Sequence, residues 1–217
     1  TTNNSSYTFA EGNTKATSST SWLGSLGTIA MGSGKWYWEV NFGAGNFASG
    51  IGQLNNGATE TVNMSTANNG VAGSYSRGYE YLKNGSLSRK YNNAAGGGSV
   101  DAVYGSVPSG GGIVMIAFDA DNGTIWAGLN GTWHASATEG EIEAGTTTNA
   151  MFSSINMDEP YLPTASIENG NISYNFGSPA YANSSDAADE DGYGAFEYAP
   201  PSGYYALCTK NLGAYGG

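Results

Sequence analysis

The stretch that decides the fold runs from residue 113 to residue 133 and reads IVMIAFDADNGTIWAGLNGTW. It begins with six apolar residues, Ile113 to Phe118, which suit one strand buried on both faces. A turn follows at Asn122-Gly123, because Asn and Gly tolerate the positive φ angles of a tight hairpin. The chain returns through a β-branched and aromatic run that contains Trp126, and it turns again at Asn130-Gly131. These features predict two successive hairpins, with Trp126 anchoring the interior of a sheet.

The composition extends this prediction to the whole chain of 217 residues. Charged residues make up only 12% and aromatic residues another 12%, and there are 34 glycines, which favours many short strands joined by turns over a helical bundle. Six Asn-Gly pairs punctuate the sequence, beginning at positions 56, 69, 84, 122, 130 and 169. We therefore predict an all-β fold, an antiparallel β-sandwich.

The charge balance excludes two classes of partner. Seven basic residues stand against 18 acidic ones, for a net charge of −11, whereas phosphate binding needs a basic face. We expect no nucleic-acid partner and, since no run of 18 apolar residues occurs, no insertion into a membrane. Cys208 is the single cysteine, so no disulfide forms within the chain, and we expect its thiol to be buried.

The remaining segments are assigned by their periodicity. Residues 35–42 (KWYWEVNF) alternate as an amphipathic strand, with Trp36 and Trp38 on the apolar side. Residues 1–30 are interpreted as an N-terminal edge strand or linker, and residues 31–217 as the β-sandwich of a single domain. Residues 135–149 and 183–195 are expected to be polar loops, and no helix is predicted.

Five short motifs, taken in order, resemble the SPRY domain. They are GKWYWEV at 34–40, GIG at 50–52, FDADNGTIW at 118–126 with LNG at 129–131, NFG at 175–177, and APPSGY at 199–204 with ALCT at 206–209. The last of these resembles the ending of SPRY-like proteins in bacterial viruses and environmental phage genomes. The resemblance spans roughly residues 30 to 209. It implies a concanavalin A-like β-sandwich without a catalytic role, which binds ligands through its loops.

The sequence departs from the family pattern at two places. Ala127-Gly128 follows Trp126 where a bulkier residue is common, and an acidic insertion at 183–195 precedes the last strand. Both departures leave the fold intact. They prevent the transfer of any known binding site of the family to this chain.

Three groups of residues have side chains of the types found in metal or catalytic sites. Asp119, Asp121 and Asn122 invite a calcium site, but the spacing of an EF-hand loop is missing, so a hairpin turn is expected and no metal. Glu139, Glu141 and Glu143 would line one face of a strand, as paired carboxylates do in glycosidases, but no apolar strand context surrounds them. A solvated loop is expected there. His134 is the only histidine and is expected at the surface.

Tyrosines gather near the one local concentration of basic residues, which comprises Arg77, Lys83, Arg89 and Lys90. Tyrosine rings stack on sugars and anchor protein partners. We therefore predict a ligand-binding site in this region, with Tyr75 as a further neighbour; its residues are Arg77, Tyr79, Tyr81, Lys83 and Tyr91.

These observations and the resemblance lead to one expected function. The chain is expected to be a non-enzymatic, virion-exposed or extracellular module of a phage or similar virus, without a cofactor. It would bind a host-surface glycan or protein receptor, or other virion proteins, and association between copies of the chain is left open. The alternatives are an intracellular SPRY protein-interaction module and a carbohydrate-active enzyme on a lectin-like sandwich.

Overall fold

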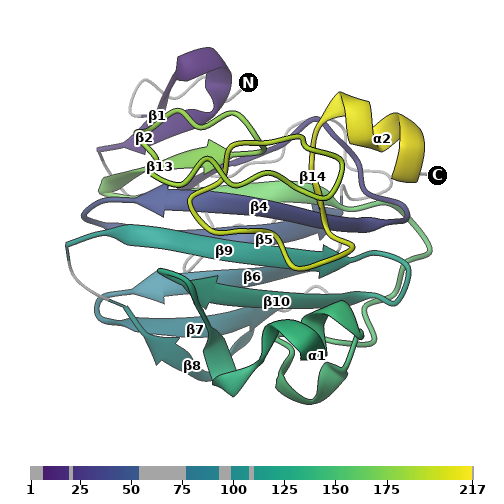
Figure 1. Cartoon of the computed structure of the whole chain (residues 1–217). Coiled ribbons are helices and arrows are strands. Elements are labelled where there is room, and N and C mark those ends of the chain that lie inside the picture. Colours follow the sequence, from purple (N-terminus) through teal and green to yellow (C-terminus); the bar gives the residue numbers. More distant parts are fainter. Residues whose placement is uncertain (1–6, 20–21, 54–76, 93–98, 108–109, 217) are drawn as a thin grey trace. The chain divides into compact units, whose positions relative to one another are not determined.

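The structure is a computed structural model that describes residues 7–19, 22–53, 77–92, 99–107 and 110–216 (Figure 1). Strands predominate over helices in the described residues, and they form two mainly antiparallel sheets. The predicted all-β, antiparallel class is therefore confirmed. The concanavalin A-like arrangement stays a prediction.

The strands and helices have the following bounds. The strands are β1 (Tyr7–Ala10), β2 (Lys15–Ser18), β3 (Leu23–Leu26), β4 (Lys35–Phe42), β5 (Asn46–Gln53), β6 (Arg77–Asn84), β7 (Leu87–Asn92), β8 (Ser99–Ser106), β9 (Gly112–Asp119), β10 (Thr124–Leu129), β11 (Thr132–Trp133), β12 (Leu162–Glu168), β13 (Gly170–Asn175) and β14 (Tyr205–Ala206). Within the described residues, the helices are α1 (Glu139–Glu143), α2 (Thr209–Tyr215) and the 3₁₀ turns η1 (Glu11–Asn13), η3 (His134–Ser136) and η4 (Thr147–Asn149).

The two sheets differ in size and order. The six-stranded sheet has the order β3-β12-β5-β6-β7-β8. The eight-stranded sheet has the order β1-β2-β13-β4-β9-β10-β11, and β14 pairs with β4. The pairing of β14 with β4 is parallel, and the other pairings whose registers are resolved are antiparallel.

The chain forms two compact units of very different charge. Unit 1 consists of Thr1–Ala30, Gly43–Gly111 and Tyr161–Ile172, and unit 2 of Met31–Phe42, Gly112–Pro160 and Ser173–Gly217. Unit 1 carries five basic and five acidic residues, whereas unit 2 carries two basic and 13 acidic residues. The whole net charge of −11 therefore belongs to unit 2.

The first 30 residues supply strands to both sheets. They contain β1, β2 and β3, of which β1 is an edge strand of the eight-stranded sheet and β3 an edge strand of the six-stranded sheet. The Tyr7 hydroxyl and the Ser25 hydroxyl are hydrogen-bonded at 3.0 Å, and the Tyr7 ring meets the Phe9 ring edge to face. Burial raises the pKa of the Tyr7 phenol to about 12.

In unit 1, the central strand β5 pairs with β12 on one side and with β6 on the other. The β5–β6 contact is so close at Gly50 that a Cβ there would lie 2.1 Å from the Tyr79 carbonyl oxygen. Only glycine fits this approach of two backbones. Beside it, Ala48 and Leu82 pack with Trp22 in a small buried cluster.

In unit 2, the predicted double hairpin is present. Strand β9 pairs with β10, and β10 pairs with β11, with Asn130 in the left-handed region at a φ of 49°. The register places Tyr37, Ala117 and Trp126 in one row across β4, β9 and β10, and all three are fully buried. The prediction that Trp126 anchors a sheet interior is confirmed.

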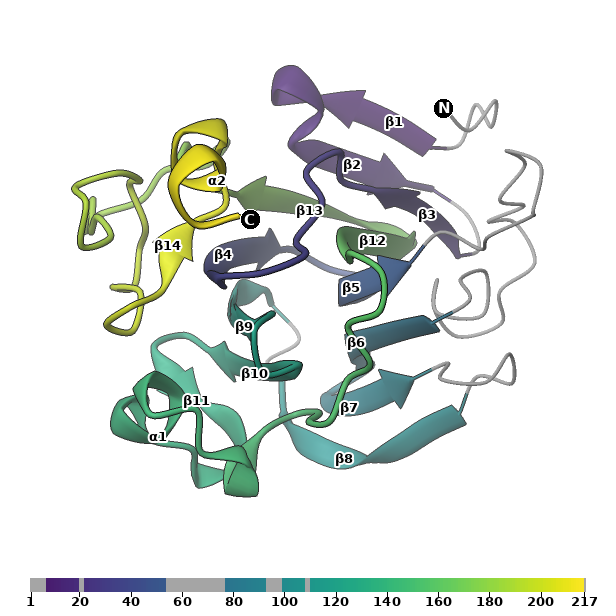
Figure 2. The same cartoon turned by 90° about the vertical axis from the view of Figure 1, so that its right-hand side faces the viewer.

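The amphipathic interpretation of β4 is wrong, because both of its faces are covered. Tyr37 and Glu39, on the side expected to be polar, have no exposed surface. A covering layer packs on that side; it consists of residues 137–150, which include α1, and residues 187–208. Its buried side chains Ile142, Phe196 and Tyr204 form one apolar cluster with Tyr37 and Trp126. Figure 2 shows α1 beside β11.

Residues 139–143 form the helix α1, so the expectation of a loop without helix is wrong there. The Thr138 hydroxyl accepts the Glu141 N–H, and the Glu141 carboxylate accepts the Thr138 N–H at 2.8 Å. This is a capping box, which satisfies two backbone donors at the start of the helix. Ile142 is the buried residue of α1, so one turn of helix fixes the layer to the sheet.

Candidate functional site

The predicted binding residues of β6 share one side of the strand, as their even spacing requires. Tyr81 is fully buried, Lys83 is 3% exposed, Tyr79 is 8% exposed, and Arg77 is half-buried. The Lys83 ammonium donates a hydrogen bond to the Gly45 carbonyl. Burial raises the pKa of the Tyr79 phenol and lowers the pKa of the Lys83 ammonium.

The burial of this side of β6 removes Tyr81 and Lys83 as direct ligand contacts, because a buried ring offers no face for stacking. The alternation of residues 77 to 83 identifies a shared face, but the same pattern suits a core face. Arg77 keeps exposed surface, and its role in binding stays a prediction. The backbone of Tyr91 pairs with Glu80, whereas the Tyr91 side chain and residue Tyr75 lie outside the described residues.

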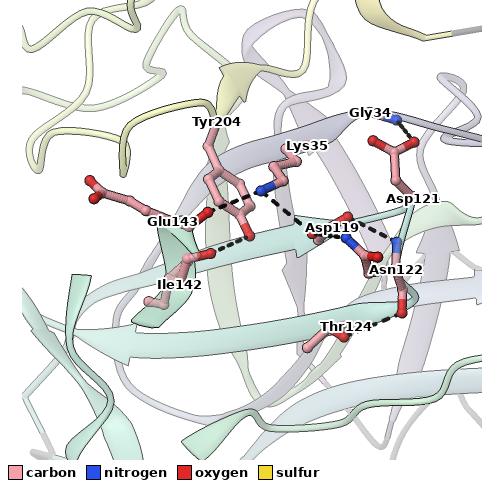
Figure 3. Close-up of polar contacts among 9 residues, drawn as sticks. All are labelled: Gly34, Lys35, Asp119, Asp121, Asn122, Thr124, Ile142, Glu143 and Tyr204. Atoms are coloured by element: carbon pink, nitrogen blue, oxygen red, sulfur yellow. Dashed lines mark hydrogen bonds and ion pairs between the residues drawn. The ribbon is translucent and has the colours of Figure 1, made fainter. Parts of the chain in front are cut away.

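The turn after β9 is the hairpin turn that the sequence predicted (Figure 3). One oxygen of Asp119 accepts the Asn122 N–H at 3.0 Å, and the other accepts the Asn122 side-chain amide at 2.9 Å. An Asp121 oxygen accepts the Gly34 N–H at 2.9 Å. These carboxylates bind amide groups of the turn and of its neighbour, which gives them a structural role.

Beside this turn, Lys35 links the sheet to the covering layer (Figure 3). Its ammonium nitrogen lies 3.7 Å from Asp119 Oδ2, donates to the Glu143 carbonyl at 3.1 Å, and stands 5.5 Å from the centre of the Tyr204 ring. The Glu143 carbonyl belongs to the C-terminal end of α1, where a cation is favoured. The Tyr204 hydroxyl donates to the Ile142 carbonyl at 3.2 Å, and burial raises its pKa. Lys35 therefore anchors α1.

Glu39 is a fully buried carboxylate in the middle of β4 that holds residues from four parts of unit 2. One oxygen accepts the Tyr198 N–H at 2.8 Å and the Tyr37 hydroxyl at 3.3 Å. The other accepts the Tyr181 hydroxyl at 2.9 Å, the Asn175 amide at 3.1 Å and the Glu197 N–H at 3.1 Å. Five donors thus replace the water that a carboxylate loses on burial. Burial and this carboxylate raise the pKa of the Tyr181 phenol.

Asp189 holds a second part of the covering layer, so the expectation that residues 183–195 form a solvated loop is wrong at this position. Asp189 is 7% exposed. Its Oδ1 accepts the N–H groups of Asp191 and Tyr193, at 3.1 and 2.9 Å. Its Oδ2 accepts the Ala206 N–H at 2.9 Å and the Asn211 side-chain amide at 2.7 Å.

Residues 183–197, which we name the Tyr193 loop, contain Asp189 and are closed by hydrogen bonds within the segment. Ala187 and Phe196 exchange both backbone hydrogen bonds, at 2.9 and 2.8 Å. The Ser184 N–H and hydroxyl donate to the Glu197 carboxylate, at 2.6 and 2.7 Å. At the tip, Tyr193 stands between two glycines and is 37% exposed. It is one of three large hydrophobic residues with exposed side chains in the described ranges, with Phe9 and Val103.

Two of the carboxylates at 139–143 have structural contacts. Glu141 caps α1 and accepts the Asn149 amide at 3.0 Å, and its bond to the Thr138 N–H lowers its pKa. Glu143 accepts the Ser202 N–H at 3.0 Å. His134 is half-buried, and burial lowers its pKa. Within the described ranges, no group of three or more His, Cys, Asp or Glu side chains is placed to hold a metal ion.

The described helices are also too short or too polar for one of them to cross a membrane.

The strongest candidate for a recognition site is the Tyr193 loop, because its ring is exposed and its backbone is held by Asp189. The sequence analysis did not predict this site. No known protein family has a model that matches this chain, and no curated protein matches it either.

Proposed function

We propose that this protein is a non-enzymatic binding module on the outside of a phage or similar virus, and that it attaches to a host-surface glycan or protein or to another virion protein. The viral setting rests on two resemblances. Residues 199–209 resemble the ending of SPRY-like proteins in bacterial viruses, and the other motifs resemble the SPRY domain. The site rests on the exposed ring of Tyr193 on a loop that buried carboxylates fix in place.

The Tyr193 loop supports binding because hydrogen bonds to buried carboxylates fix its backbone. Asp189 receives the Tyr193 N–H itself, and Glu39 receives the N–H groups of Glu197 and Tyr198 at the other end of the loop. A loop held in this way loses little conformational freedom on binding. Tyrosine is a common anchor of binding surfaces, since it combines a rigid apolar ring with a hydroxyl.

The charge of unit 2 limits the kinds of surface that this unit can bind. Thirteen acidic residues against two basic ones repel an anionic surface such as nucleic acid or an anionic polysaccharide. A neutral glycan or a protein surface with basic residues fits this unit better. The carboxylates at 139–143 support binding over hydrolysis, because Glu141 and Glu143 serve the cap of α1 and its contact with Ser202.

The test is binding of the purified protein to a glycan array and to envelopes from a panel of bacteria. Tyr193→Ala is expected to weaken the binding about tenfold or more, as loss of an aromatic anchor typically does. Phe9→Ala is the matched control, because Phe9 has a similar exposure, 39% against 37%, and belongs to unit 1. Circular dichroism verifies that both variants are folded.

Three results would contradict the proposal. The first is a wild-type protein that binds no glycan, no envelope and no virion protein. The second is equal loss of binding in Tyr193→Ala and Phe9→Ala, which would move the site away from the Tyr193 loop. The third is release of reducing sugar from a glycan that stops in Glu141→Gln while the protein remains folded, which would identify an enzyme.

A further inference from the structure

The Asn-Gly pairs that make the turns of this chain are also chemically reactive. In such a pair, the Gly nitrogen attacks the Asn side-chain carbon Cγ, the Cγ–Nδ2 bond breaks, and ammonia leaves as a cyclic imide forms. Water then opens the imide at either carbonyl and yields aspartate or isoaspartate. Glycine permits the reaction because no Cβ hinders the approach. The reaction needs a free carboxamide, an available Gly N–H and room for the backbone to shift.

Three of the four pairs in the described ranges lack a free carboxamide or room for the backbone to shift. Asn122 donates both its N–H and its side-chain amide to one carboxylate, at 3.0 and 2.9 Å. The Asn130 side chain accepts the Ile113 N–H at 2.9 Å. In the third pair, a Cβ on Gly170 would lie 2.2 Å from the Ala44 carbonyl oxygen, so the backbone there has no room to move.

The pair Asn84-Gly85, between β6 and β7, meets more of the conditions. Asn84 is exposed, and no hydrogen bond of its side chain is found within the described residues. Gly85 has a φ of 64°, and no described atom lies within 4 Å of the position that a Cβ would take. One contact restrains the attacking nitrogen, because the Gly85 N–H donates to Asn46 Oδ1 at 2.9 Å. Asn46 is held in turn by Glu168, at 2.8 Å.

We propose that Asn84 is the described Asn-Gly site that converts most readily to aspartate and isoaspartate in the folded protein, and that Asn46 sets the rate. An N–H that donates to Asn46 is less free to lose its proton and attack. Conversion changes unit 1 from neutral to −1 at neutral pH. Isoaspartate also lengthens the backbone inside the turn, next to the pair Asn84 and Leu87 that closes the β6–β7 hairpin. The inference is independent of the proposed function.

The test follows Asp plus isoAsp at residues 84, 122, 130 and 169 by peptide mapping and mass spectrometry. Wild-type protein is aged at mildly alkaline pH in the folded state and, in parallel, in urea. Unfolding removes the structural differences, so the folded-to-unfolded rate ratio at each site measures protection. We expect the ratio to be highest at Asn84. Asn46→Ala is expected to raise the Asn84 rate several-fold and to leave the Asn130 rate unchanged, and Asn84→Gln abolishes the signal.

Two results would overturn the proposal. One is a folded-to-unfolded ratio at Asn84 that is no higher than at the other three sites. The other is a folded Asn46→Ala protein whose Asn84 rate equals that of the wild type. If Asn46→Ala does not fold, the wild-type ratios alone decide, since they require no variant.

Discussion

Replacing Glu39 by glutamine tests whether the buried carboxylate holds unit 2 together. The substitution keeps the size of the side chain and exchanges one acceptor oxygen for an NH₂ group. Hydrogen-bond donors surround both oxygens, so the new NH₂ group faces donors in either orientation. Tyrosine hydroxyls can turn and accept, but the N–H groups of Glu197 and Tyr198 cannot.

The expected cost follows from these contacts. In one orientation the Glu197 N–H loses its acceptor at 3.1 Å, and in the other the Tyr198 N–H loses its acceptor at 2.8 Å. A buried donor without a partner costs about 1–3 kcal/mol. The remaining bonds lose the charge that makes them roughly twice as strong as neutral ones, which adds about 1 kcal/mol. We expect Glu39→Gln to lower the free energy of unfolding by about 2–4 kcal/mol.

Denaturant unfolding at pH 7 measures this difference, and thermal unfolding should show a loss of roughly 5–15 °C in a chain of this size. Glu139→Gln is the control, because Glu139 is an exposed carboxylate in the first turn of α1 and its removal should cost less than about 1 kcal/mol. A Glu39→Gln protein within about 0.5 kcal/mol of the wild type, the range of ordinary surface substitutions, would refute the reasoning.

Three further predictions concern stability. Gly50→Ala should destabilise the protein by about 1–3 kcal/mol, because its Cβ would collide with the Tyr79 carbonyl, whereas Gly140→Ala, in open space within α1, should be neutral or stabilising; equal denaturation midpoints would contradict this. The pKa of Tyr7 is raised from 10.0 to about 12, so its contribution of about 2–3 kcal/mol is fully present below pH 10 and is lost as the pH rises through 12. Midpoints measured across this window should fall less steeply in Tyr7→Phe than in the wild type, and identical slopes would count against the assignment. Raising the ionic strength from about 0.01 to 0.15 M should raise the unfolding midpoint, because salt screens the repulsion within the acidic unit 2; an unchanged or lower midpoint would exclude this.

The sequence predicted those parts of the fold that local chemistry determines. Asn122-Gly123 and Asn130-Gly131 favour tight turns through their own backbone preferences. The double hairpin could therefore be predicted from the sequence. The capping box of Thr138 and Glu141 was equally local, but it was missed because the alternating glutamates of this segment were interpreted as a strand face or a solvated loop. A Thr-x-x-Glu spacing before Ile142 was the signal for it.

The candidate site was harder to predict, because burial depends on segments far away in the sequence. Alternation placed Tyr79 and Tyr81 on one face of β6 correctly, but it does not tell a core face from a solvent face. Asp189 looks like a solvent-exposed residue in an acidic run until Ala206 and Asn211 are seen to donate to it. The same carboxylate accepts the Tyr193 N–H, and no local pattern in the sequence predicts that the Tyr193 ring is exposed.

The buried carboxylate in β4 also has a consequence for synthesis of the chain. Asn175, Glu197 and Tyr198 follow Glu39 by 136, 158 and 159 residues. At about 5–20 residues per second, a ribosome needs roughly 7–30 s to supply these partners after Glu39 has been made. A nascent chain that buried β4 earlier would enclose a charge without donors, which is strongly unfavourable. Unit 2 can therefore close only after residue 198 has been made, and a truncation before residue 175 should leave it unfolded.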